Sequence, residues 1–294
     1  MSDNIGTYYV QQHNITLQLL LQQRGSKLRG KVATGNHVGE KASPVDQAGS
    51  LTANKVTARN QPITLKNIPT DRRWVYSNDY DLAQAIDSFD KLKMIVNAES
   101  PFTMAAMYAM GRAYDNEIID AFFGTAKTGV NGSTSTTFPA GNVIAVNHDS
   151  SSNTGLTAAK LKEAATMAMA NEVDLEFDQL WCAITANQHG DLLNEIQVIS
   201  RDYNETPVIQ SGKITSLFGI NFVHTELLDV DSNSYRKVPV WAQSGMYLGM
   251  WQEPQSRLSI RNDLTSEPIQ IYTKGSFGAT RLEEKKVFQI LCAE

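Results

Sequence analysis

Cysteine is almost absent from this chain, which has only Cys182 and Cys292 in 294 residues. Two cysteines cannot build a disulfide framework, and neither has a partner at the spacing of a metal site. Both lie in apolar stretches typical of strands, where a free thiol is usually buried. The sequence therefore predicts two buried thiols in a reducing compartment.

Basic residues are outnumbered, with 26 Lys and Arg against 31 Asp and Glu and a net charge of −5. Proteins that grip nucleic acid normally carry a basic excess, so tight binding of DNA or RNA is not expected. No apolar run approaches the roughly 20 residues needed to cross a bilayer, and the first residues show no signal-peptide pattern. These absences predict a soluble protein made and kept in a cytoplasm, with no membrane partner.

Catalytic motifs are also missing. The pair Gly212 and Lys213 lacks the glycine and the Ser or Thr that complete a phosphate-binding loop, and no dinucleotide-binding or nucleophile-elbow motif occurs. The five histidines are scattered, and the acidic run 229–233 lacks the glycine and distal glutamate of a calcium loop. Glu283 and Glu284 are interpreted as a solvated charge cluster. We expect no enzyme activity, no cofactor, and no catalytic, cofactor-binding or metal-ligating residues.

The most strongly specified element is a helix over residues 100–124. Ser100 is a suitable N-cap before Pro101, and Gly124 is predicted to end the helix in a left-handed conformation. Arg112 is expected to pair with Asp115 on a polar side that faces a neighbour or an interior space. At 1.5 Å per residue the helix is roughly 35 Å long. An apolar stripe recurs every fourth residue: Phe102, Ala106, Met110, Tyr114, Ile118 and Phe122.

Two segments before this helix have no core of their own. Residues 1–28 form a polar arm with one apolar patch at 15–21, which is too short for a stable helix. Residues 29–72 are polar, with valines and isoleucines alternating in short strand-like pieces. They predict a long two-stranded excursion with a polar tip. Because an isolated hairpin is marginal in water, we expect it to be stabilised by a partner.

The remaining pattern mixes helices and strands. Apolar periodicity predicts helices over 79–97, 156–171 and 186–199. A turn is predicted at Asn131–Gly132. Strands are predicted at 74–77, 143–146, 178–185, 217–224, 238–241, 246–251, 258–261, 269–274, 277–280 and 286–292.

The order of these parts resembles the major capsid protein of tailed bacteriophages, with the Hong Kong 97-type fold. Residues 74–124 look like that family's loop-exit strand, short acidic helix and spine helix, a likeness carried by Asp87, Asp90, Ala113 and 115–119. LWCAITANQHGDLL (180–193) resembles the axial-domain strand and helix, and SGKITSLFGINFVHTELL (211–228) the turn and strand that follow. FGATRLEEKKVFQILCAE (277–294) looks like the terminal strand pair of the peripheral domain.

The resemblance implies an α+β fold with an N-terminal arm, an extended β-hairpin loop, a spine helix in a peripheral domain and an α/β axial domain. The expected division is arm 1–28, extended loop 29–78, peripheral domain 79–155 and 264–294 with spine helix 101–123, and axial domain 156–263. Some members cross-link a loop lysine to an asparagine. Lys31, Lys41 and Lys55 lie in the loop here, but no acceptor is identifiable, so that chemistry is not carried over.

The function implied is that of a shell subunit that forms pentamers and hexamers of an icosahedral virion enclosing double-stranded DNA, without sequence-specific binding. No scaffolding segment precedes the arm, so a separate scaffolding protein is expected, together with a portal and decoration proteins, and assembly in the host bacterial cytoplasm. Two alternatives stay open. An encapsulin-type nanocompartment would contain a cargo enzyme, and an α/β enzyme would be a small oligomer with a deep polar pocket.

Overall fold

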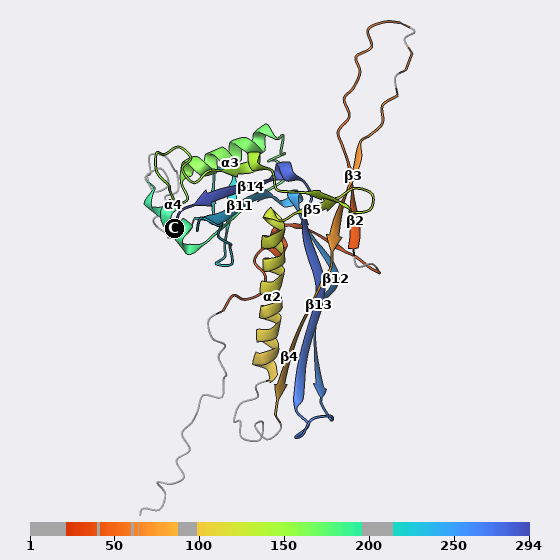
Figure 1. Cartoon of the computed structure of the whole chain (residues 1–294), viewed down its shortest axis with the longest axis vertical. Helices are drawn as coiled ribbons and strands as arrows, with labels where there is room; N and C mark the ends of the chain where they lie inside the picture. The colour runs from red at the N-terminus through yellow and green to blue at the C-terminus, as the bar shows by residue number, and fades with distance from the viewer. Residues whose placement is uncertain (1–21, 40–41, 60–61, 64, 88–98, 196–213) are drawn as a thin grey trace, which may run out of the picture.

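The computed structural model describes residues 22–39, 42–59, 62–63, 65–87, 99–195 and 214–294. They form a mixed α+β fold of three sheets with a few helices, elongated along one axis (Figure 1). Four 3₁₀ turns connect these elements: η2 (Arg29–Lys31), η3 (Ala140–Asn142), η5 (Gln243–Gly245) and η6 (Glu284–Lys286).

The long helix α2 (Glu99–Phe123) lies along a four-stranded sheet (Figure 1). The strands run in the order β1 (Ala33–Asn36), β12 (Met246–Ile260), β13 (Ile269–Arg281) and β4 (Asn78–Ile86). The predicted apolar stripe is confirmed, because Phe102 packs against Ile86 and Ile271 and the remaining members are buried. Those members are Ala106, Met110, Tyr114, Ile118 and Phe122.

The ends of α2 differ in detail from the prediction. The helix begins at Glu99, so Ser100 lies within it rather than at its N-cap. It ends before Gly124 as expected, but Gly124 does not have a positive φ. A Cβ on Gly124 would lie 2.7 Å from the Asp120 carbonyl oxygen, so a close backbone approach, rather than a left-handed turn, explains the glycine.

The predicted helix over 79–97 is wrong in its first half. Residues 78–86 form strand β4, which pairs with β13 over nine positions, and residues 88–98 lie outside the described part of the chain. Tyr80, Leu82, Gln84 and Ile86 alternate with exposed residues, as expected for a strand with one covered face. Pairing with a long neighbouring strand therefore overrides the local helical periodicity of this segment.

The second layer is a six-stranded sheet in the order β7 (Val143–Ile144), β14 (Val287–Cys292), β11 (Arg236–Ala242), β8 (Leu180–Ile184), β10 (Ile220–His224) and β9 (Ser216–Leu217). Helices α3 (Ala158–Ala170) and α4 (Ala186–Asn194) lie beside it (Figure 1). The predicted helix over 186–199 is described only to residue 195. Trp241 of β11 is fully buried, and its ring centroid is 4.6 Å from that of Phe122 in α2. This aromatic contact joins the two layers.

The predicted terminal strand pair is wrong. β13 pairs with β12 and β4, whereas β14 pairs with β11 and β7 in the other sheet. β14 is the more apolar of the two, with Val287, Phe288, Ile290 and Cys292 all fully buried. A strand buried on both faces belongs inside a covered sheet, which the six-stranded sheet supplies.

Strands β12 and β13 are each one long strand where the sequence predicted two short ones. They pair from Met246↔Arg281 to Ile260↔Ile269, with register shifts between Met250 and Gln255. Pro254 lies in this interval, and a bulge accommodates a residue that cannot donate a ladder hydrogen bond. The ribbon therefore continues past the polar interval that suggested a break.

The third sheet has the order β2 (Ala42–Ala48), β3 (Thr70–Tyr76), β5 (Ala126–Thr128) and β6 (Thr134–Thr136). β2 and β3 pair from Ala42↔Tyr76 to Ala48↔Thr70, which confirms a two-stranded excursion. Its beginning is corrected, since β1 pairs with β12 and Leu28 and Val32 lie in the main core. The predicted turn at Asn131–Gly132 is confirmed between β5 and β6.

Candidate assembly site

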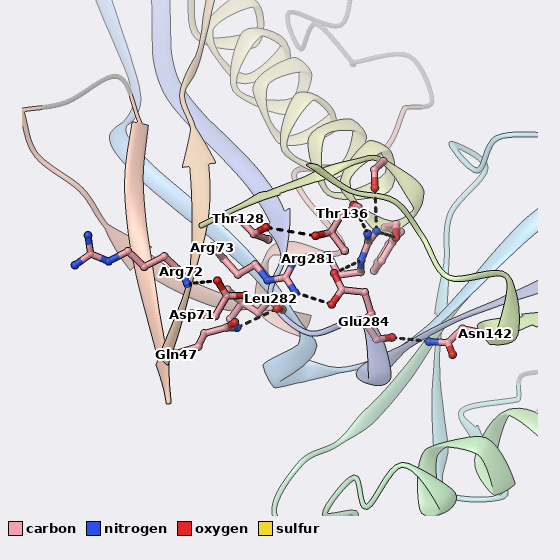
Figure 2. Close-up of polar contacts among 12 residues, drawn as sticks. Gln47, Asp71, Arg72, Arg73, Thr128, Thr136, Asn142, Arg281, Leu282 and Glu284 are labelled. Carbon is pink, nitrogen blue, oxygen red and sulfur yellow. Dashed lines mark hydrogen bonds and ion pairs between the residues drawn. The ribbon is translucent and has the colours of Figure 1, made fainter. Parts of the chain in front are cut away.

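The β2–β3 hairpin joins the body of the molecule through a buried ion pair. Arg73 of β3 donates from Nη2 to Oε2 of Glu284 in η6 at 2.6 Å, and only 8% and 19% of the two side chains are exposed (Figure 2). A charge-assisted hydrogen bond is strongest where water is excluded. Arg73 follows the alternation of β3, which turns residues 73 and 75 inward. The pair therefore fixes the hairpin base to the segment between β13 and β14.

Arg281 extends this contact to the long helix. Its Nη1 atom donates to the carbonyl oxygens of Phe122, at 2.8 Å, and Gly124, at 3.0 Å. The last carbonyls of a helix lack intrahelical partners and carry partial negative charge, so a buried cation is favourable there. Nε of Arg281 lies 3.6 Å from Oε1 of Glu284. Burial lowers the pKa of Arg281, and Glu284 opposes that effect.

Two amides complete the hairpin base (Figure 2). Nε2 of Gln47 in β2 donates to the Leu282 carbonyl at 2.9 Å, so both strands of the hairpin contact the same segment. Nδ2 of Asn142 donates to the carbonyls of Glu284 and Val287 at 2.5 and 3.0 Å. Because β2 and β3 both contact residues 282–284, and Asn142 of η3 holds that segment in turn, the direction of the hairpin is set by the body.

Beyond this base the hairpin exposes apolar side chains. Figure 1 shows the described residues beyond this base, 49–59, 62–63 and 65–69, projecting away from the rest of the molecule. Exposed apolar clusters of this kind mark surfaces that bind a partner. The five exposed side chains, between 52% and 90% accessible, are Leu51, Val56, Ile63, Leu65 and Ile68.

A second contact anchors the described end of the arm to α2. Asp115 is fully buried, and Oδ1 accepts from Ser26 Oγ at 2.5 Å and from the Leu28 amide at 3.0 Å. Oδ2 accepts from Gln23 Nε2 and from the Lys27 amide, the latter at 3.0 Å. A carboxylate with this many donors needs no cation to stabilise its charge.

The polar side of α2 is therefore corrected. Asp115 binds the described end of the arm, residues 22–28, which is called the arm base. Arg112 donates to Oε1 of Gln22 and to the Gln23 carbonyl rather than to Asp115. Gly111 lies one turn before Asp115, and a Cβ there would be 2.5 Å from the Gly25 carbonyl carbon. The arm base thus crosses α2 where the helix has no side chain. Residues 1–21, including the patch at 15–21, lie outside the described residues.

The cysteines, lysines and metal-ligating residue types considered in the sequence form no common site among the described residues. Cys182 and Cys292 are free and buried, as predicted. Within the described ranges no three His, Cys, Asp or Glu side chains could hold a metal ion. Lys31 lies 3.9 Å from the Trp181 ring centroid and Lys55 is exposed, whereas Lys41, Gly212 and Lys213 lie outside the described residues. In the part of the chain described, no helix is long and apolar enough to span a membrane.

Sequence reasoning missed Arg73, Arg281 and Glu284, and it placed Glu284 in a solvated cluster. The structure corrects this, since Glu284 contacts two buried arginines while Glu283 pairs with Lys286 at the surface. Two arginines at inward positions of strand-like segments were the available signal. A buried arginine requires a partner, and only the fold identifies which of the two glutamates supplies it.

A sequence profile described as phage capsid protein matches residues 5–294. A search of curated proteins finds no match.

Solved capsid structures share the fold over nearly the whole length of each chain. The capsid of Cyanophage P-SCSP1u is 14% identical with a TM-score of 0.76, covering 100% of this chain and 96% of the other. The capsid of Ralstonia phage GP4 is 10% identical with a TM-score of 0.74, covering 100% and 98%. The Cyanophage Pam1 capsid is 10% identical with a TM-score of 0.73, covering 98% and 97%.

These findings decide between the alternatives left open by the sequence. The fold is the expected Hong Kong 97-like capsid fold, and the role is structural rather than enzymatic. The encapsulin alternative is not favoured, because the profile and the similar structures are those of phage capsids. The chain belongs to the phage capsid protein family.

Proposed function

We propose that this subunit self-assembles as pentamers and hexamers into the icosahedral head of a tailed double-stranded DNA phage. The observation that carries the proposal is the hairpin, whose base is fixed by a buried ion pair while its outer part exposes five apolar side chains. A two-stranded hairpin is only marginally stable in water, and its exposed apolar side chains mark a surface for a partner. We therefore expect a neighbour to cover this hairpin. A neighbouring subunit is the partner that a shell supplies.

The proposed division into domains follows the sheets. Helix α2 and the four-stranded sheet correspond to the peripheral domain, and the six-stranded sheet with α3 and α4 corresponds to the axial domain. The last strand, β14, is assigned here with the axial domain, because it pairs with β11. The hairpin and the arm 1–28 remain separate assembly elements in this division.

The proposed partners rest on charge and on the family resemblance. With a net charge of −5, the shell would enclose DNA without sequence-specific binding. A separate scaffolding protein, a portal and decoration proteins are proposed from the resemblance alone. The protein would occupy the virion after assembly in the host bacterial cytoplasm.

Excision of the hairpin tip tests the proposal. Ala48 and Thr70 are paired across β2 and β3, so residues 49–69 can be replaced by Asn-Gly, which favours a two-residue hairpin turn. The shortened chain should fold, because Arg73, Gln47 and their partners are retained. Expressed with its neighbouring gene products, it should no longer form particles in negative-stain micrographs.

Two results would contradict this function. Shells of normal size from the shortened chain would show that the tip is dispensable for assembly. Loss of cooperative thermal unfolding in the purified shortened chain would show instead that the tip belongs to the subunit's own core.

A further inference from the structure

The described residues in the outer part of the hairpin, 49–59, 62–63 and 65–69, are called the tip here, and the tip is basic as well as apolar. It contains Lys55, Arg59 and Lys66 and no Asp or Glu. All three basic side chains are exposed, and Lys66 also donates to the Thr52 carbonyl across the hairpin. Its apolar side chains are equally open. The surface that covers the tip must therefore be apolar and acidic.

The same chain exposes such a surface between α3 and β8. This surface is called the α3–β8 patch. Phe177 is 88% exposed and Met169 is 61% exposed. Leu175, which lies between them in the sequence, is 37% exposed. The other members of the patch are the exposed carboxylates of Glu172, Asp174 and Glu176. No Lys or Arg occurs from residue 169 to 179.

The α3–β8 patch is preformed rather than loose. The Val173 amide donates to the Ala168 carbonyl at 3.1 Å, and Val173 is buried in the main core. The Asp178 amide donates to the Asp174 carbonyl at 2.8 Å, and the Glu176 amide donates to Asp174 Oδ1 at 3.1 Å. A rigid surface loses little conformational entropy when it binds.

Its carboxylates are available for a partner. Among the described residues, no Lys or Arg forms an ion pair with Glu172, Asp174 or Glu176. Asp178, at the edge of the patch, is already bound by the amide of Ser244 at 3.1 Å. Among the described residues, three carboxylates that form no ion pair thus share this segment with three exposed apolar side chains.

We infer that the tip of one subunit docks on the α3–β8 patch of a second copy of this chain. Three cations and five apolar side chains on the tip match three carboxylates and three apolar side chains on the patch. Opposite charges across an interface select the partner and its register. This inference rests on the proposed role of the hairpin in assembly and names the surface that receives it.

The direction of the hairpin favours the patch of another subunit over the subunit's own patch. The hairpin leads away from the body, while α3 lies across the six-stranded sheet (Figure 1). Each half of the tip has about ten residues. An extended chain of that length reaches roughly 30 Å past Ala48 and Thr70, which is enough to overlie a neighbour. Each subunit offers one tip and one patch, so the contact is heterologous, the kind that closes into a ring where the rotation between subunits allows it.

Charge reversal on both sides tests the inference in the full-length chain, expressed with its neighbouring gene products. Lys55→Glu with Arg59→Glu leaves Lys66 and its bonds to Thr52 intact. Glu172→Lys with Glu176→Lys leaves Asp174, which holds the turn. Each pair of substitutions should raise the protein concentration needed for half-assembly about tenfold or more, because like charges then face each other.

The combination of both reversals is the decisive variant. It should restore assembly to within about threefold of the unaltered chain, since the ion pairs are re-formed with opposite sense. The matched control reverses two exposed carboxylates on β4, by Asp79→Lys with Asp81→Lys, and should not restore assembly of the tip variant. Particle yield is measured by sedimentation and negative-stain microscopy.

The outcomes separate this inference from the proposed function. If excision of the tip abolishes assembly but the combined reversal does not restore it, the inferred pairing is overturned while the hairpin's role stands. Rescue by the β4 control, or an effect of the patch reversal alone without any effect of the tip reversal, also overturns the pairing. Assembly without the tip overturns both.

Discussion

At the scale of single residues, Glu284 is a carboxylate that contacts two buried guanidinium groups. Arg73 donates to it at 2.6 Å, and Nε of Arg281 lies 3.6 Å away. Arg73 is 6% exposed and Arg281 is 1% exposed, so water cannot reach the two guanidinium groups to stabilise their charge in place of the carboxylate. Without Glu284, two like charges would remain in the interior.

Glu284→Gln should therefore destabilise the subunit by about 3 kcal/mol, because it leaves a buried guanidinium without its counter-charge. Chemical denaturation of the unassembled subunit measures this loss. Glu283→Gln is the matched control. Glu283 pairs with Lys286 at the surface and half of its side chain is exposed, so the change should cost less than about 1 kcal/mol. Equal costs for the two variants would show that the buried pair contributes nothing special.

At the scale of elements, α2 has a glycine where helix propensity favours almost any other residue. Gly111→Ala would normally stabilise a helix by about 1 kcal/mol. Here the added Cβ would lie 2.6 Å from the Gly25 Cα, so the arm base must move away from α2 and Asp115 loses donors. We expect no net stabilisation and faster tryptic cleavage after Arg24, Lys27 and Arg29, mapped by mass spectrometry.

The matched control for this prediction is Gly190→Ala in α4. No atom lies within 4 Å of the Cβ that it would add, so only the gain in helix propensity remains. Its thermal midpoint should rise, and cleavage at the arm base should not change. If Gly111→Ala behaves in the same way, the arm base does not depend on the close approach at Gly111.

Elements were predictable where local signals and tertiary contacts agree. α2 and α3 combine an apolar stripe with helix-forming residues, and both occur within two residues of the predicted range. The prediction of a helix at β4 was wrong because the spacing of Leu82, Ala85 and Ile86 also fits a helix. Only pairing with the partner strand β13 makes this segment a strand. β12 was predicted as two strands, 246–251 and 258–261, because a bulge leaves no mark in a single sequence.

At the scale of the whole molecule, the order of parts gave the fold, whereas the assembly site needed coordinates. An exposed hairpin could be expected from residues 29–72, since their composition cannot form a core. Its attachment could not be expected, because Arg73 and Glu284 are 211 residues apart in the chain. Contacts at that separation depend on the topology of all three sheets.

Amide hydrogen exchange tests the whole-molecule picture. In the unassembled subunit, amides of the described tip residues, 49–59, 62–63 and 65–69, should exchange at nearly the unprotected rate, since these residues are exposed and lie outside regular strands. In particles, the same amides should slow by at least about tenfold, because a neighbour covers the tip and reduces local opening. β11, which is buried in both states, serves as the internal reference. Unchanged exchange in the tip on assembly would contradict its docking on a neighbour, since an element that stays open in the shell has no partner there.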